Sequence, residues 1–397
     1  MDIEIKPDLV LGVDTQYFSR LDIDGFADMM KDPSYCYKFY WLEAIVNLIC
    51  EGIEVTTFDE LIDEMIANAW YTVTEFHIHL SSVIKGEICD GLERAVNNLA
   101  VMAKDELNSQ SSKLEIKDAI KKYNVGLRSE KTQLTAMVPY RALAGFFNNS
   151  DDNTPLKWSS APWMTEYIRH FHEVHNKLPY TLGDKSRLQK EVLFDKDWGQ
   201  MIKDNAPAIL GWIKFEKIKW LQMINPDVPN LVYKLVPEDK VRKLDRVRKL
   251  WNGIIEISKD PILDVFNHKP MVKDAFDIDH FIPWTFVMND ELWNLMPMDS
   301  SLNSQKNNNL PNWTLFFGGF ADNQFLMYEM VRTSKHDQIR KLFDDCYKDN
   351  LHSIWAINEL YNVEHTKSEF ADILEKNMHP IYESAKRQGY REWKYGA

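Results

Sequence analysis

One short segment near residue 280 limits the possible fold more than any other part of the chain. It runs from Asp274 to Pro311 and reads DAFDIDHFIPWTFVMNDELWNLMPMDSSLNSQKNNNLP. The letters FDID alternate apolar and polar side chains, as a half-buried strand does, and a chain reversal near Asn289 lets a second extended segment return beside it. Asp299 or Ser300 can then cap a short helix. The pattern predicts a strand, a loop, a second strand and a helix.

The polar residues of this segment suit hydrolysis of a phosphodiester bond. Side chains on a strand repeat every two residues, and residues three apart on a helix share a face, so these side chains can converge. Carboxylate and amide oxygens bind a hard cation such as Mg²⁺. A histidine beside the metal can take a proton from water, and a lysine can offset charge on phosphorus. The set is Asp277, Asp279, His280, Asn294, Asn303 and Lys306.

The segment resembles the ββα-metal motif of HNH endonucleases, in the form found in the HNH domains of RNA-guided CRISPR effector nucleases. That form has an Asp-x-Asp-His strand, followed by Asn, Asn and Lys at 14, 23 and 26 residues after the histidine. Asn294, Asn303 and Lys306 stand at those distances from His280. Many HNH enzymes have histidine in place of Asn303, so the chain is similar to a His-Asn-Asn variant. The flanking helices are similar to those of uncharacterised bacterial HNH proteins.

The resemblance implies a role for each of these residues. His280 is the general base, while Asp279 and Asn303 bind Mg²⁺ or Mn²⁺, with at most a supporting role for Asp277. Asn294 holds the loop and orients His280. The last member, Lys306, contacts phosphate or the transition state.

The cysteines bear on both metal binding and cellular compartment. None forms the close pairs that bind structural zinc in many HNH enzymes, so no structural zinc is expected. Their wide spacing also argues against a disulfide framework, and this favours a cytoplasmic protein. The chain has no apolar run long enough to cross a membrane, so no membrane partner is expected. The four are Cys36, Cys50, Cys89 and Cys346.

The net charge of −13 is unusual for a protein that binds nucleic acid, but its distribution explains part of this. Residues 1–100 hold 19 Asp and Glu against 6 Lys and Arg, so they carry the whole imbalance. Residues 211–250 hold 10 Lys and Arg against 5 Asp and Glu, and a nuclease needs only a local basic surface. These cations lie along one side of a predicted helix, which is either a site of nucleic-acid contacts or simply a solvated helix face. The residues concerned are Arg242, Lys243, Arg246 and Lys249.

Helical periodicity dominates the rest of the chain and predicts a mainly α fold with an embedded ββα-metal motif. Thr57 and Glu60, for example, stand at capping-box spacing, whereas residues 135–147 fit an extended or buried segment. We expect four parts: an acidic helical domain at 1–125, a helical middle region with the basic helix at 126–258, the HNH nuclease at 259–320 and C-terminal helices at 321–397.

Other groups of polar residues have simpler interpretations. His170, His172 and His175 resemble a metal cluster, but helical geometry places His170 well away from His172, so ordinary helix histidines are favoured. His77 and His79 are interpreted as core or surface histidines. The basic and aromatic tail, residues 385–397, is typical of either a single-strand binder or, more simply, a short end helix.

The most consistent function is metal-dependent endonucleolytic hydrolysis of DNA, for which the resemblance implies 5′-phosphate and 3′-hydroxyl products. Bacterial defence against phage or foreign DNA, or restriction, is the setting expected by analogy. Cutting both strands would require a homodimer or two binding events. Two alternatives stay open: a nuclease subunit that acts on RNA or only with an ATPase or sensor partner, and a catalytically dead HNH binding module.

Overall fold

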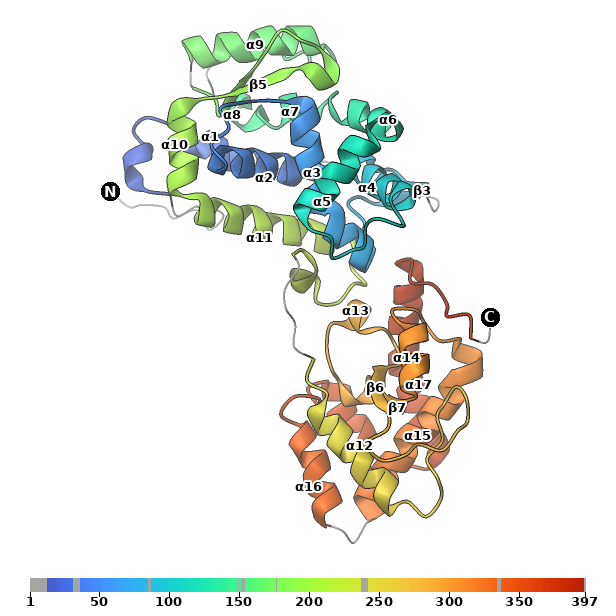
Figure 1. The fold of residues 1–397 in the computed structure, drawn as a ribbon. Helices are drawn as coiled ribbons and strands as arrows, with labels where there is room; N and C mark the ends of the chain where they lie inside the picture. The colour runs from blue at the N-terminus through green and yellow to red at the C-terminus, as the bar shows by residue number, and fades with distance from the viewer. Residues whose placement is uncertain are drawn as a thin grey trace, which may run out of the picture. The chain divides into compact units, whose positions relative to one another are not determined.

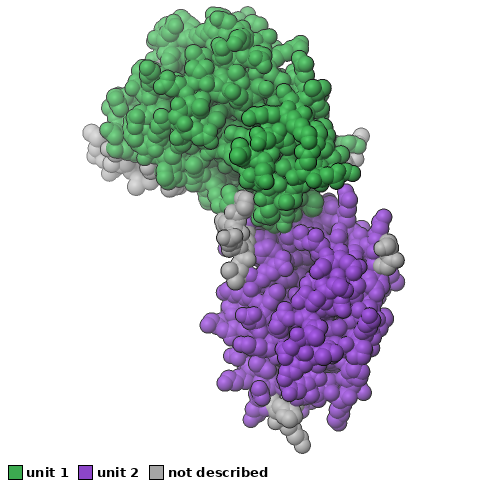
Figure 2. All heavy atoms as spheres, in the orientation of Figure 1, with its two compact units in different colours: residues 1–226, 234–237 green, residues 227–233, 238–397 purple. Residues whose placement is uncertain are grey.

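The computed structural model divides the chain into two compact units (Figures 1 and 2). Unit 1 comprises Met1–Pro226 and Lys234–Pro237, and unit 2 comprises Asp227–Tyr233 and Glu238–Ala397. Both are built mainly from helices, as the periodicity predicts. The structure describes residues 13–30, 36–84, 87–148, 150, 154–175, 177–236, 242–333 and 337–395.

Unit 1 is built around two long helices, α2 (Tyr37–Cys50) and α3 (Phe58–Phe76). The predicted capping box of α3 is present, with the Thr57 hydroxyl accepting from the Glu60 N–H and the Glu60 carboxylate accepting from the Thr57 N–H. Apolar side chains of both helices are buried in one core. The other helices of the unit are η1 (Thr15–Tyr17), α1 (Ile23–Asp28), α4 (Gly91–Met102), α5 (Lys113–Lys122), α6 (Asn124–Leu134), α7 (Val138–Arg141), α8 (Ala144–Asn148), α9 (Ala161–Val174), η2 (Arg187–Gln189), α10 (Lys196–Asp204), α11 (Ala206–Ile224) and η3 (Leu231–Lys234), the last of which crosses the unit boundary.

A small sheet that the periodicity did not predict lies in unit 1. The strands β1 (Val55–Thr57), β5 (Glu191–Phe194) and β4 (Tyr180–Leu182) form an antiparallel sheet in the order β1-β5-β4. Each strand is only three or four residues long, which is too short for an alternating pattern to stand out. A separate pair of two-residue strands is formed by β2 (Val83–Ile84) and β3 (Glu87–Ile88).

The apolar segment 135–147 is buried, as one of its two interpretations predicts, but it is not extended. It forms α7 and α8, with Pro139 near the start of α7, where the missing N–H of proline costs nothing. The side chains of Tyr140 and Phe146 are almost fully buried. This segment supplies part of the wall of a cavity discussed below.

The compact units do not follow the four expected parts. Residue 125 lies inside α6, and both α5 and α6 pack against α3 within unit 1. In unit 2, residue 320 lies inside α15 (Trp313–Thr333), which packs against the nuclease hairpin.

Unit 2 places a two-stranded hairpin among helices. The strands β6 (Asp277–His280) and β7 (Leu295–Met298) pair antiparallel, and α14 (Ser300–Lys306) follows directly. In Figure 1 these elements lie in the middle of the unit, with α12 (Asp245–Ile257) and α15 beside them. The remaining elements are α13 (Trp284–Val287), η4 (Leu292–Asn294), α16 (Asp337–Cys346), the π-helical η5 (Ala356–Leu360) and α17 (Lys367–Arg387).

Two predicted helices are shorter than expected. The basic helix begins at Asp245, so Arg242 and Lys243 precede it, and the start of the predicted helix, residues 238–241, lies outside the described residues. Hydrogen bonds with other segments hold Lys243 at both its N–H and its carbonyl, which is incompatible with a helical turn.

At the C-terminus the prediction of a short end helix is wrong. The helix α17 ends at Arg387, and the tail that follows is extended and pairs with Leu310.

Membrane insertion finds no support in the part of the chain that the structure describes, where every helix is too short or too polar to span a bilayer.

Candidate active site

The frame of the site is the hairpin β6–β7 followed by α14. The register pairs Asp279 with Met296 and His280 with Leu295, so the polar strand lies against a buried apolar one. The Asp299 side chain accepts the N–H groups of Ser301 and Leu302, which fixes the start of α14 immediately after β7. This is the strand, loop, strand and helix order that the sequence predicts.

His280 is buried and has a specific carboxylate partner. The residue is 2% exposed, and its Nε2 lies 2.9 Å from Oδ1 of Asp290. The other Asp290 oxygen accepts the backbone N–H of Lys243 at 2.7 Å. A carboxylate only accepts hydrogen bonds, so the imidazole proton is on Nε2 and the Nδ1 lone pair is left free to take a proton.

The ionisation of this pair is set by burial and by the hydrogen bond between its members. Burial lowers the pKa of His280 below its usual range, and the hydrogen bond to Asp290 opposes this only in part. Burial alone would raise the pKa of Asp290, but hydrogen bonds from His280 and from the Lys243 N–H bring it below its usual range. At neutral pH the pair therefore consists of a neutral imidazole and an ionised carboxylate, which is the state that a general base requires.

Asn294 holds the loop that follows His280. Its Oδ1 accepts the N–H of Ile282 at 2.8 Å, and its Nδ2 donates to the carbonyl of the same residue at 2.8 Å. Its backbone carbonyl also accepts the N–H of Phe281. The side chain is fully buried, so it positions the backbone next to His280 and does not touch substrate. This geometry supports the orienting role that the resemblance implies.

Lys306 occupies a position different from the phosphate contact that the resemblance implies. Its side chain is fully buried, and its Nζ lies 2.9 Å from Oδ2 of Asp279 and donates to the carbonyl oxygen of His280 at 2.7 Å. An ammonium group with these partners anchors α14 to β6. It also offsets the charge of Asp279, which is 8% exposed.

The three predicted metal ligands lie on the side of β6 that faces α14. Asp277 and Asp279 are two residues apart on the strand, and Asn303 Nδ2 donates to Oδ2 of Asp277 at 3.3 Å. That bond uses the nitrogen of the Asn303 amide and leaves its oxygen as a donor for a cation. Although Asp279 Oδ2 has Lys306 beside it, it is buried without a well-formed hydrogen bond.

These observations fit a hard divalent cation. Oxygen donors from two carboxylates and one amide match the preference of Mg²⁺ or Mn²⁺. Within the described ranges, no three His, Cys, Asp or Glu side chains gather into a metal site. A metal bound here would therefore use the Asn303 oxygen and water in addition to a carboxylate.

The predicted basic residues divide into two groups. Lys243 and Arg246 form ion pairs with Asp349, at 3.1 and 2.7 Å, so their charges are partly offset. Arg242 stacks over the Trp284 ring, 4.9 Å from its centroid, and its charge lowers the pKa values of the His280–Asp290 pair. Together with exposed Lys249 they line a cavity of about 480 Å³ beside α12 and α16.

The other histidines considered in the sequence have structural partners. His172 accepts the Leu178 N–H at its Nδ1, and no metal cluster forms around it in the described segments. His77 ends α3 in a left-handed conformation, so it does not belong to a strand. His79 has an acidic partner that the sequence does not reveal, because its Nδ1 lies 2.8 Å from Glu93.

Two residues that matter for the site do not stand out in the sequence. Asp290 reads as part of a turn, although it stands ten residues after His280 on the loop that must return to it. The buried Asn350 lies far along the chain, and its Nδ2 donates to the carbonyls of both Lys243 and Asp290. The spacing of Asp290 gives a weak signal, whereas Asn350 gives none.

Comparison with known proteins agrees with this geometry. The family described as HNH endonuclease matches residues 265–312, which contain the hairpin, α14 and all six predicted site residues. Searches of curated proteins and of solved structures each gave no match. The sequence match and the strand–loop–strand–helix order coincide over the same residues, and on this basis the chain contains an HNH endonuclease domain of the ββα-metal type.

Proposed function

We propose that this protein is a metal-dependent endonuclease that hydrolyses phosphodiester bonds in DNA, with His280 as the general base. One observation carries the proposal. A buried, neutral histidine has one ring nitrogen fixed by Asp290 and the other available, and it directly follows the candidate metal ligand Asp279. A histidine that served only to fill the core would not require an ionised partner to select its tautomer.

The chain's own residues would divide the work as follows. Asp290 keeps the proton on His280 Nε2, so that Nδ1 takes the proton from the water that attacks phosphorus. Asn294 fixes the backbone after His280, and Lys306 fixes the backbone carbonyl of His280 itself. The histidine is thereby held from both sides, which limits the reorganisation needed during reaction.

A divalent cation would complete this arrangement. Asp279 and Asn303 would hold it, with Asp277 in support through its hydrogen bond to Asn303. When bound, such a cation stabilises negative charge on the phosphate and on the leaving oxygen. Its identity, Mg²⁺ or Mn²⁺, follows from the oxygen donors alone and is part of the proposal.

The substrate is proposed to approach over Arg242 and the cavity beside α12. The charge of Arg242 lowers the pKa of His280, so this arginine lies close enough to contact a phosphate near the cleaved bond. Lys249 and Lys348 line the adjoining cavity, where several cations outnumber the carboxylates. A cytoplasmic setting and a role in bacterial defence or restriction complete the proposal by analogy.

A plasmid-nicking assay tests the proposal. Wild type is incubated with supercoiled plasmid in Mg²⁺, Mn²⁺ or EDTA, and nicked circles are expected only with metal. His280→Ala should lower the nicking rate about 10²- to 10⁴-fold, because general-base catalysis contributes that much. His170→Ala, an exposed helix histidine of unit 1, is the matched control and should keep the wild-type rate.

The same assay separates the alternatives. Cleavage of RNA but not of DNA would show that RNA is the substrate. Cleavage only after addition of a partner protein would show that the chain acts as a subunit of a larger nuclease. Binding of DNA without cleavage in either metal would identify an inactive HNH fold and refute the proposal. Equal nicking by wild type and His280→Ala would point to a contaminating nuclease.

A further inference from the structure

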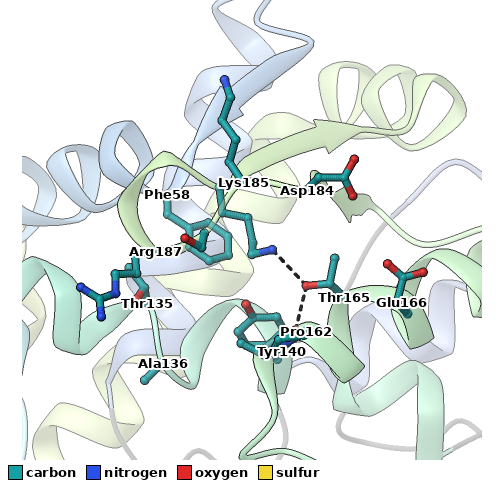
Figure 3. A pocket seen from close by; sticks show the side chains of 13 residues that line it. Phe58, Thr135, Ala136, Tyr140, Pro162, Thr165, Glu166, Asp184, Lys185 and Arg187 are labelled. Carbon is teal, nitrogen blue, oxygen red and sulfur yellow. Dashed lines mark hydrogen bonds between the residues drawn. The ribbon is translucent and has the colours of Figure 1, made fainter.

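Unit 1 contains a cavity that the nuclease chemistry does not use. It has a volume of about 320 Å³ and lies between the start of α9 and the connection that joins β4 to β5 (Figure 3). Thr165 and Glu166 of α9 line it, as do Asp184, Lys185 and Arg187 of the connection, and in Figure 3 the side chain of Lys185 extends away from Thr165. This volume is at the lower end of the range for small-molecule sites.

Lys190, which lines this cavity, is a buried cation without a counter-ion. It is 6% exposed, and its Nζ donates to Thr165 Oγ1 and to the Gly183 carbonyl, both at 3.1 Å. Both acceptors are neutral, and no described carboxylate lies within ion-pair distance of Nζ. Burial lowers the pKa of this lysine. A buried charge is costly unless an opposite charge compensates it.

Two other buried lysines, Lys131 and Lys217, do have such a partner. Lys131 forms ion pairs with Asp59 and Asp63, and Lys217 forms one with Glu43 at 2.7 Å. The difference at Lys190 is that open space, and not a carboxylate, adjoins its side chain. The third N–H of its ammonium group is therefore available to a ligand.

The carboxylates near the cavity supply only part of the missing charge, because Asp184 and Glu166 act on Lys190 from beyond ion-pair distance and already have partners. Arg169 pairs with Glu166 at 3.3 Å and with Asp184 at 2.7 Å, while Lys185 pairs with Glu191 at 3.0 Å. Arg187 is exposed and has no ion pair with any described residue. It is held at a φ of 54°, in the left-handed region that a residue with a side chain rarely adopts.

The remaining lining selects the kind of ligand. Thr165 Oγ1 donates to the Ala161 carbonyl at 2.8 Å and accepts from Lys190, so its hydroxyl is fixed. Phe58, Tyr140 and Pro162 add apolar wall, and burial raises the pKa of Tyr140, so its hydroxyl stays neutral. The lining thus offers one buried cation without an ion-pair partner and apolar surface for an organic group.

We propose that this cavity binds a small organic phosphate monoester, with the phosphate against Lys190. A phosphate monoester carries a charge of about −1.5 to −2 at neutral pH, which compensates a buried cation more strongly than a single carboxylate does. The organic part would occupy the space beside Tyr140 and Pro162. This inference does not depend on the nuclease proposal, because all the residues concerned lie in unit 1.

Isothermal titration calorimetry with the full chain tests the proposal. The probes are adenosine monophosphate, inorganic phosphate, adenosine and benzoate, in buffer free of phosphate and of added divalent metal. Adenosine monophosphate should bind saturably and more tightly than inorganic phosphate, and adenosine should not bind. Lys190→Met should weaken binding of the monophosphate about 30-fold or more, because it removes a buried charge partner. The matched control Lys122→Met, whose lysine is exposed, paired with Glu106 and not part of the cavity lining, should bind within about twofold of wild type.

The melting temperature of ligand-free protein provides a second measurement. If Lys190 is retained for a ligand, Lys190→Met should melt at the same temperature as wild type or higher, since a buried unpaired charge has been removed. A lower melting temperature without any saturable phosphate binding in wild type would make Lys190 a purely structural residue and overturn the proposal. Equal affinity in wild type and Lys190→Met would also overturn it. Tighter binding of benzoate than of the monophosphate would reject the phosphate assignment.

Discussion

Two buried lysines, one in each unit, show how differently a fold can handle the same charge. Lys306 in unit 2 is fully enclosed and lies 2.9 Å from the Asp279 carboxylate. Lys190 in unit 1 is almost as buried, but its hydrogen bonds go only to a hydroxyl and a carbonyl. In the nuclease hairpin the charge is compensated by the chain itself, whereas in unit 1 an adjoining cavity leaves room for an external anion.

The two lysines differ in purpose: one charge holds neighbouring groups in position, and the other is available to bind a ligand. The HNH domain holds its polar groups in place with one internal ion pair, Lys306 with Asp279, and one hydrogen-bonded pair, His280 with Asp290. Its polar atoms are fixed before any substrate arrives, which is what preorganised catalysis requires. The unit 1 cavity has no such internal balance at Lys190, and its charge becomes balanced only if a ligand enters.

Replacing each lysine by methionine tests this contrast and should give the largest effect on stability. Lys306→Met leaves the Asp279 carboxylate buried without its cation, so the free energy of unfolding should fall by about 3–5 kcal/mol. Lys190→Met removes an uncompensated charge and should leave the free energy of unfolding unchanged or raised. Urea denaturation of both variants and of wild type measures the difference. If both variants lose similar stability, the two lysines have the same structural role and the contrast is false.

A smaller effect is expected when the hydrogen-bonded pair of His280 and Asp290 is changed. In Asp290→Asn the amide can donate to His280 Nε2, which places the imidazole proton on Nδ1 and blocks the base. The nicking rate should fall about 10- to 100-fold, as is typical when the partner of a functional histidine is lost. Asp274→Asn, an exposed carboxylate before the same hairpin, serves as the control and should retain full activity.

The pH profile makes the Asp290 test specific. The proposed mechanism requires neutral His280, whose pKa lies below the ordinary histidine value of about 6.5. Wild-type nicking should therefore persist below that value and be lost as the pH falls through the pKa of His280 in the folded protein. Asp290→Asn should be slow even at pH values where the histidine is neutral. A variant that keeps the full rate, with the acid limb of its profile moved to lower pH, would show that Asp290 tunes the pKa of His280 but not its tautomer.

The smallest effect should come from a charge that lies outside the buried pairs. Arg242→Ala should weaken DNA binding about fivefold or less, because an exposed cation contributes little on its own. It should also reduce the dependence of binding on salt by about one released counterion. Fluorescence anisotropy at several salt concentrations measures both, with Lys259→Ala, an exposed lysine outside the basic cavity, as the control. An unchanged salt dependence would remove Arg242 from the proposed path of the DNA.

The sequence predicts those parts of the fold that local patterns encode. The capping box at Thr57 and Glu60, the cap at Asp299 and the alternation around Asp279 are all settled within a few residues, and the structure contains each of them. The sheet β1-β5-β4 was missed because Val55 pairs with Leu193, far along the chain, and each strand is only three or four residues long. Such long-range pairing leaves no local periodic signal.

The candidate site divides in the same way. The spacing of Asn294, Asn303 and Lys306 from His280 is visible in one segment, and the structure gathers these side chains around β6. Two features were not predictable, because tertiary contacts decide them. The burial of Lys306 depends on how closely α14 packs on β6, and Lys190 reads as an ordinary surface lysine until its side chain is placed beside a cavity.

The buried Asn350 has a consequence for the HNH domain as an evolutionary and engineering module. It ties Lys243 to Asp290, and both it and Lys243 lie outside residues 265–312, the segment that matches the family. Gln324, which donates to the Leu295 carbonyl, and Arg391, whose carbonyl accepts the Leu310 N–H, also lie outside it. A transplanted segment limited to 265–312 would carry every motif residue yet leave the partner of its histidine unsupported. The motif is therefore portable as a sequence pattern, while the arrangement that holds the proposed catalytic base depends on residues elsewhere in the second unit.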